Sequence, residues 1–169
     1  MPPVSQIQQP LKALVLIFLW SALFEDAALF LMSWLAPDIW FHLFHNTEPA
    51  SLDVAFLRRS AGQWAAFTLA QGIALWHWQR QPIWLAIVAG VRFSDLFTDI
   101  SYILAVPTLT MLGWIALVPP PFLNLFGVAI MLRGYRQASA SLARMRSQEL
   151  TPSRVGHLPA AVRVADPDD

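Results

Sequence analysis

The sequence predicts an all-α membrane protein with four transmembrane helices in a compact antiparallel bundle. Three observations lead to this fold class. Hydrophobic residues make up 56% of the 169 residues and charged residues only 13%, whereas soluble domains carry roughly 25% charged residues. Four apolar segments approach the length of about 20 residues that a helix needs to cross a bilayer. Prolines stand beside several ends of these segments and favour helix boundaries there.

The first span is too long for the apolar region of a signal peptide, which covers about 7–15 residues. The second span lies in a helix that we expect to begin at Ser51, a good N-cap residue. The third follows Pro82, which suits the first turn of a helix. The fourth is predicted to be broken at the triple proline 119–121. The predicted spans, which together form a transmembrane domain over 11–133, are 11–35, 60–78, 83–105 and 108–132.

The orientation of the bundle follows from its basic residues, because Lys and Arg near span ends concentrate on the cytoplasmic side. Four spans place both termini on one side, and that side is the more basic one. We therefore expect a cytoplasmic N-terminus over 1–10 and a cytoplasmic tail over 134–169, basic and helical at first and disordered from Thr151. One side carries Lys12, Arg80, Arg133, Arg136, Arg144 and Arg146, and the other only Arg58 and Arg59.

Composition excludes several classes of protein and indicates a source. Basic and acidic residues number 11 each, so the basic excess of a nucleic-acid-binding protein is missing. The chain has no cysteine, which excludes disulfides, thiol catalysis and cysteine metal ligands. The bias toward Arg over Lys, with abundant Ala, Leu and Trp, indicates a bacterial protein and hence the bacterial inner membrane.

Most tryptophans are expected at the two membrane surfaces, where an aromatic belt forms without any ligand. Trp20 and Trp114 sit deeper in their spans and are exceptions. The residues assigned to the belt are Trp34, Trp40 and Trp64 on the outer side and Trp76, Trp78 and Trp84 on the inner side.

Five ionisable residues fall near the middle of two spans: Glu25 and Asp26 in the first, and Arg92, Asp95 and Asp99 in the third. A charge at the bilayer centre costs about 2.5–3.5 kcal/mol on insertion scales. Each of these groups must therefore face the bundle interior and find a partner, a proton or water. A single guanidinium neutralises only one or two of the four carboxyls, so the remainder should hold protons or bind a cation.

Helical geometry brings these groups together. Arg92, Asp95, Asp99 and Tyr102 fall within about 80° of one another on one helix face. The first and third spans cross the membrane in the same direction, and counting the rise from the centre of each span places Glu25 and Asp26 at a depth between Asp95 and Asp99. The cluster either joins helices as buried polar contacts or forms a functional site. The candidate binding residues are Glu25, Asp26, Gln71, Arg92, Asp95, Asp99, Tyr102 and Asn124.

The triple proline removes three amide donors near the centre of the fourth span. It should free the carbonyls of Ile115, Ala116 and Leu117, and Asn124 follows within about one turn. Non-helical backbone at this depth persists only inside protein or beside a cavity. The break is either a packing kink or part of a binding or transport site.

The first outer loop is expected to hold a short interfacial helix with Asp38 as its N-cap. Asp38, His42 and His45 then share one helix face, and Glu48 or Asp53 could complete a zinc site. This pattern is weak, since exposed histidines commonly accompany interfacial aromatics. We predict no metal site, and the sequence names no cofactor.

A stripe of small residues at four-residue spacing follows the second span: Gly62, Ala66, Ala70 and Ala74. Small residues let helices approach closely in membranes. The stripe can pack within the bundle or against a second copy or another subunit, and the first arrangement is favoured.

Three functions remain open from the sequence. The first is binding, with or without chemical modification, of a small or lipid-like ligand at the carboxylate and arginine cluster, where a protonated acid could act as a general acid. The second is a proton- or cation-coupled transporter or a subunit of one. The third is a non-catalytic accessory subunit of a larger membrane complex.

Overall fold

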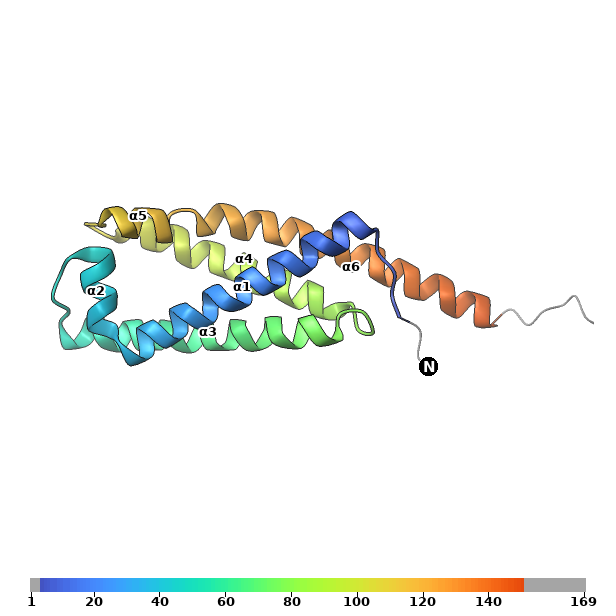
Figure 1. The fold of residues 1–169 in the computed structure, drawn as a ribbon, viewed down its shortest axis with the longest axis horizontal. Coiled ribbons are helices and arrows are strands. Elements are labelled where there is room, and N and C mark those ends of the chain that lie inside the picture. Colours follow the sequence, from blue (N-terminus) through green and yellow to red (C-terminus); the bar gives the residue numbers. More distant parts are fainter. Residues whose placement is uncertain (1–3, 151–169) are drawn as a thin grey trace, which may run out of the picture.

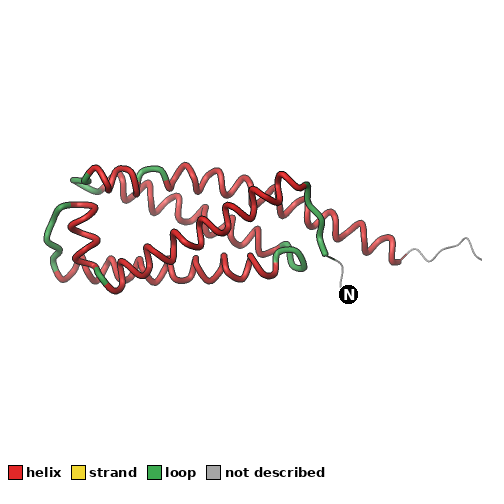
Figure 2. The backbone as a smooth tube through the Cα atoms, in the orientation of Figure 1, coloured by secondary structure: helices red, strands yellow, loops and turns green. Residues whose placement is uncertain are grey.

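The computed structural model describes residues 4–150, and these residues form helices joined by short loops with no strand (Figure 2). The predicted all-α class is thereby confirmed. Residues 1–3 and 151–169 are not described, so the disorder predicted from Thr151 lies outside the described residues. The helices are α1 (Gln9–Leu35), α2 (Pro37–His45), α3 (Ser51–His77), α4 (Ile83–Ala105), α5 (Met111–Leu117) and α6 (Pro120–Leu150).

The bundle consists of two helix pairs. Helix α1 packs most extensively against α3, and α4 packs most extensively against α6. The short helices α2 and α5 lie together at one end, and the α3–α4 turn and the N-terminal segment lie at the other (Figure 1). Helix α1 crosses from α3 toward α6 at that second end, and α6 continues past the bundle.

The end near the α3–α4 turn is tightly packed, and we call it the closed half. Gly134 of α6 lets three helices approach, since a Cβ there would lie only 3.1 Å from Val15 and 3.2 Å from Leu85. The N-terminal segment is tied to this end by a hydrogen bond of 2.8 Å from the Ser5 amide to the Gln79 carbonyl. The buried cluster of the closed half comprises Leu11, Val15, Leu19, Ala74, Trp78, Leu85, Val88, Ala89, Ile130 and Met131.

The opposite end, which we call the cavity half, has a smaller buried cluster of Trp40, Phe44 and Leu57. Thr110 holds α5 against α2, because its amide donates to the Phe44 carbonyl at 2.9 Å. Gly113 is required at this contact, since a Cβ would lie 2.5 Å from the same carbonyl oxygen.

Two local predictions about helix ends need correction. Helix α3 begins at Ser51, but its N-cap is Ala50. Asp53 Oδ2 accepts a hydrogen bond from the Ala50 amide at 2.9 Å, and this bond takes the place of the predicted serine cap. Asp38 does not cap α2: it lies in the first turn, and the N-cap is Ala36.

Length and apolarity support two membrane spans among the described residues: Gln9–Leu35 and the stretch Met111–Gln148. The predicted second and third spans, which lie in α3 and α4, do not meet these criteria of length and apolarity. Helix α4 is long enough but carries Arg92, Asp95 and Asp99 together. The second of the two stretches runs across the prolines, where α5 ends at Leu117 and α6 begins at Pro120.

Not all of the tryptophans assigned to the membrane surfaces are exposed on the surface of the bundle. Trp40 is 3% exposed and Trp78 is 1% exposed, and both fill the buried clusters at the two ends of the bundle. The interfacial assignment of these two residues is wrong because each helix end meets another element that covers the indole. Trp34 and Trp76 are exposed, as residues of such a belt would be, and Trp20 and Trp114 are exposed as well.

The small-residue stripe winds from the surface into the bundle along α3. Gly62 and Ala66 are exposed, and a Cβ at Gly62 would meet nothing within 4 Å. Ala74, at the other end, is fully buried in the closed half. Only one end of the stripe therefore packs inside the bundle.

Candidate functional site

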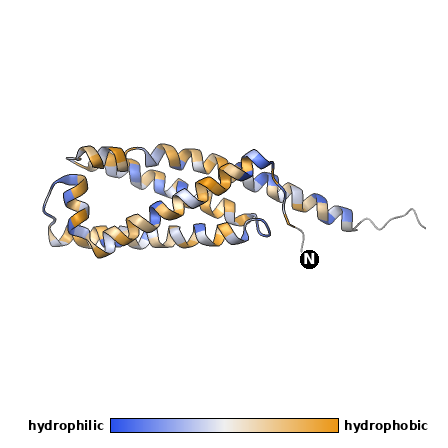
Figure 3. Ribbon diagram, in the orientation of Figure 1, coloured by the Kyte–Doolittle hydropathy of each residue, from blue (hydrophilic) through white to orange (hydrophobic). Residues whose placement is uncertain are grey.

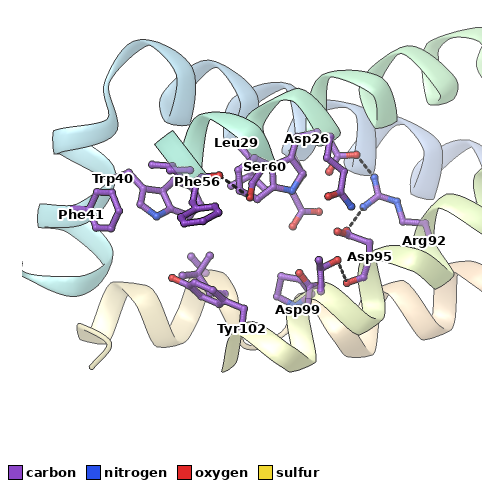
Figure 4. Close-up of a pocket in the computed structure, with 18 of the residues that line it drawn as sticks. Asp26, Leu29, Trp40, Phe41, Phe56, Ser60, Arg92, Asp95, Asp99 and Tyr102 are labelled. Atoms are coloured by element: carbon purple, nitrogen blue, oxygen red, sulfur yellow. Dashed lines mark hydrogen bonds and ion pairs between the residues drawn. The ribbon is translucent and has the colours of Figure 1, made fainter. Parts of the chain in front are cut away.

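Arg92 lies at the centre of a buried polar network between the two helix pairs. Its Nη2 donates to Asp26 Oδ2 on α1, and its Nη1 donates to Asp95 Oδ2 on its own helix at 3.3 Å (Figure 4). Arg92 is 2% exposed and Asp26 is 1% exposed. The guanidinium also lies 5.9 Å from the ring centroid of buried Phe67. A fixed positive charge is thus held between two carboxylates and shielded from solvent.

Asp26 accepts a second hydrogen bond at the same oxygen. Gln71 of α3 donates to Asp26 Oδ2 through Nε2 at 2.7 Å. Polar side chains of α1, α3 and α4 therefore meet at one depth in the bundle. Gln71 Oε1 and Arg92 Nε are buried without a hydrogen-bond partner among residues 4–150.

Asn124 connects α6 to the network. Its Oδ1 accepts from Arg92 at 3.3 Å, and its Nδ2 donates to Asp95 at 3.2 Å and to Asp99 at 2.9 Å. The side chain reaches these groups because α6 begins at Pro120, one turn earlier, and directs its first turns toward α4. The Asn124 amide thus bridges two carboxyls. Asp95 also pairs with Arg92, whereas Asp99 forms no ion pair within the described residues.

A cavity of about 340 Å³ begins at this network and extends toward α2 and α5. It is partly open, and Figure 4 shows charged side chains at one end and aromatic side chains at the other. Its polar walls include Ser60, Gln63 and Thr98. Its aromatic walls are Trp40, Phe41, Phe56, Trp64 and Tyr102.

Glu25 and Asp99 line this cavity from opposite helix pairs. The described residues give Glu25 no hydrogen bond and no ion pair. Asp99 accepts only from Asn124 within the same part of the chain, and it also feels the charges of Asp95 and Glu25. The cavity therefore has carboxyl groups that Arg92 does not engage.

Tyr102, placed by the sequence on the same face as the acids, bonds elsewhere. Its hydroxyl lies 2.5 Å from His45 Nε2 on α2. His45 Nδ1 lies 3.0 Å from the Thr108 carbonyl, which only accepts, so Nδ1 carries a proton and donates. With His45 neutral, Nε2 accepts from the Tyr102 hydroxyl. This chain of bonds attaches α2 to α4 beside the cavity.

The outer-loop residues considered for zinc point in different directions. His42 pairs with Glu48 at 3.2 Å on the surface. His45 is 8% exposed and faces Tyr102, and Asp38 lies in the first turn of α2. Within residues 4–150, no group of three histidine, aspartate or glutamate side chains is placed to hold a metal ion.

The aromatic wall does not follow from the sequence pattern. The pattern assigns Trp40 and Trp64 to an interfacial belt, whereas their rings lie 5.5 Å apart at the cavity. It gives no role to Phe41 and Phe56. The available indication is the crowding of aromatic residues around the first outer loop. It does not show which rings face inward, because that depends on how α2 folds back over α3.

Comparison with protein-family models, curated proteins and solved structures finds no match to this chain. The residues and geometry of the site are therefore the basis for a functional assignment.

Proposed function

We propose that this protein is a four-span integral membrane protein that binds a small or lipid-like ligand in the cavity between its helix pairs. The spans are α1, α3, α4 and the α5–α6 segment, and α2 lies at the outer membrane surface. The observation that carries the proposal is the cavity of about 340 Å³, with carboxylates at one end and aromatic rings at the other. Cavities of this size with a few converging polar groups are typical ligand sites.

The exposure of the apolar helices supports a membrane location. Only 22% of the most apolar window of α1 is buried, and only 28% of that in the stretch Met111–Gln148. The core helix of a soluble protein would be mostly buried. Large side chains such as Phe24, Ile115 and Phe122 are more than half exposed. Hydrophobic residues dominate the bundle helices, whereas hydrophilic residues gather in loops and at the distal end of α6 (Figure 3).

The pairing of the inward charges supports α3 and α4 as further spans. Their polar side chains at mid-depth, Gln71, Arg92 and Asp95, are buried and bonded to one another or to Asp26. Charged residues in membrane helices characteristically face the bundle and pair in this way. The proposed orientation keeps both termini in the cytoplasm, in line with the basic residues of the α3–α4 turn and of α6.

The interruption between α5 and α6 supports a site rather than a packing kink alone. Ala116, Leu117 and Pro120, which flank it, line the cavity. Prolines at 119–121 leave the preceding carbonyls without amide partners one turn later. Backbone of this kind is tolerated in a bilayer where it borders a cavity.

The position of the cavity favours binding over transport. It lies in the cavity half, and the buried cluster of the closed half separates it from the α3–α4 turn. Transport requires access from both sides of the membrane. The transporter and accessory-subunit hypotheses remain alternatives, tested by flux into vesicles and by the composition of the purified particle.

The test is retention of a ligand through purification. Ala116→Trp fills the cavity, whereas Ala129→Trp adds the same ring on an exposed position of α6. Native mass spectrometry from mild detergent should show a bound small molecule or lipid on the wild type and on Ala129→Trp, and none on Ala116→Trp. Equal occupancy in both folded variants would contradict the proposal, as would a wild type without ligand.

A further inference from the structure

The charge balance of the cavity walls identifies a chemical class of ligand. Five carboxyls line the cavity, those of Glu25, Asp26, Asp53, Asp95 and Asp99, together with one guanidinium. Arg92 is already bonded to Asp26 and Asp95. Its charge is therefore neutralised at the deep end, and it cannot balance the other acids.

The carboxyls that remain are distributed around the open space. Glu25 on α1 has no hydrogen bond or ion pair within the described residues, and Asp99 on α4 has only the Asn124 amide there. The two carboxyls line the cavity from opposite helix pairs. Asp53 lies farther along α3, where it accepts the Ala50 amide. A cation bound between these carboxyls would gain a carboxylate partner from each helix pair.

Aromatic rings form the wall beside these acids. The ring centroids of Trp40 and Trp64 lie 5.5 Å apart. Phe41, Phe56 and Tyr102 complete the wall, and Figure 4 shows them with Trp40. The face of an aromatic ring attracts a cation, by about 2 kcal/mol or more when the cation is desolvated. Rings and dispersed carboxylates together are the recognition surface for an organic ammonium group.

A metal ion fits this geometry poorly. Direct ligation needs three or more oxygen or nitrogen ligands at about 2.0–2.6 Å. Across the described part of the chain, no group of three acidic or histidine side chains is placed closely enough. A larger cation with delocalised or alkyl-shielded charge needs no such shell and matches a cavity of about 340 Å³.

We infer that the cavity binds an organic cation, an amine or quaternary ammonium compound with an apolar body, between Glu25 and Asp99 and against the aromatic wall. This inference rests on the proposed function and adds the charge of the ligand. Phe56, Trp64 and Tyr102 would contact the apolar body. The Arg92 network would close the deep end.

The test compares a cation with its neutral isostere. Benzyltrimethylammonium and neopentylbenzene have nearly the same shape and differ in one quaternary atom, nitrogen or carbon. Each is titrated calorimetrically against the protein in nanodiscs of zwitterionic phosphatidylcholine. We expect the cation to bind at least about tenfold more tightly, the difference that one desolvated cation–ring contact supplies.

The variant Glu25→Gln with Asp99→Asn should weaken this preference, because it removes the two carboxyls and leaves the aromatic wall in place. Affinity for the cation should fall about tenfold, whereas affinity for the neutral compound stays unchanged. The matched control Glu48→Gln removes a carboxylate that pairs with His42 outside the cavity and should change neither affinity.

The outcomes separate the inference from the proposed function. Equal binding of both compounds, or a cation affinity unaffected by the double variant, would overturn the cation assignment while leaving a ligand site that Ala116→Trp blocks. Absence of binding by either compound, together with a wild type that purifies without ligand, would overturn both.

Discussion

The closed half and the cavity half are built from the same four long helices but pack differently. In the closed half, facing positions are apolar, and Val15, Leu19, Leu85 and Val88 are fully buried. In the cavity half, charged and aromatic side chains face inward and leave a space of about 340 Å³.

The difference shows how side-chain chemistry determines helix separation. Apolar side chains interdigitate and exclude voids, because an atom that faces a void forgoes its dispersion attraction. Carboxylates on facing helices repel one another, and each also needs a partner or solvent. Glu25 and Asp99 present polar groups that need a partner or solvent, so they do not form a close apolar contact as Val15 and Leu85 do. The network around Arg92 marks the boundary between the two halves.

The largest expected effect comes from removing both acids that hold Arg92. Asp26→Asn with Asp95→Asn leaves a buried guanidinium without a carboxylate and should cost about 3–5 kcal/mol of stability. Arg92→Gln should cost less, because the remaining carboxyls can take protons, whereas a guanidinium cannot lose one. Unfolding in mixed micelles measures both free energies.

The control for this prediction is Glu25→Gln with Asp99→Asn. Neither acid bonds to Arg92, and an asparagine at 99 keeps an acceptor for the Asn124 amide. This double variant should lower the free energy of unfolding by less than about 1 kcal/mol. Equal losses in the two double variants would show that the network does not depend on the pairing of Arg92.

A second prediction compares one leucine from each half. Leu19 is fully buried in the closed half, so Leu19→Ala should leave a void and cost about 2–5 kcal/mol. Leu29 lines the existing cavity, and Leu29→Ala should cost below about 1 kcal/mol, because its side chain is packed on fewer sides. The same unfolding assay gives both values. Similar costs would mean that the cavity half packs as tightly as the closed half.

A third prediction uses two glycines. Gly113→Ala forces a Cβ against the Phe44 carbonyl of α2 and should cost about 1–3 kcal/mol through displacement of α5. Gly62→Ala enters open space on α3 and should be neutral or stabilising by up to about 1 kcal/mol. Thermal unfolding distinguishes them. A destabilising Gly62→Ala would indicate that this face is covered by another chain.

The smallest expected effect concerns the two tyrosines. Tyr102→Phe removes the hydrogen bond to His45 and should cost about 1 kcal/mol. The hydroxyl of Tyr135 has no hydrogen bond within residues 4–150, so Tyr135→Phe should be silent. Hydrogen exchange of α2 should rise in the first variant alone. Unchanged exchange would show that the bond does not hold α2 in place.

Much of the candidate site follows from spacing along the chain. Arg92 and Asp95 are three residues apart, and the rise counted along each span brings Asp26 and Gln71 to their depth, where the structure places them together. The partner of Tyr102 does not follow from spacing. It depends on α2 folding back so that His45 reaches α4.

The sequence by itself determined that the chain is helical and apolar and that its mid-helix charges must face one another, because periodicity and the cost of isolated charges are local properties. Tertiary structure alone decided which acids Arg92 engages and which stay unpaired among the described residues. It also decided that Trp40 and Trp78 are buried and that the helix pairs enclose a cavity. These outcomes depend on where helices from distant parts of the chain meet and how far apart they lie. No residue pattern within one helix specifies the separation between helices.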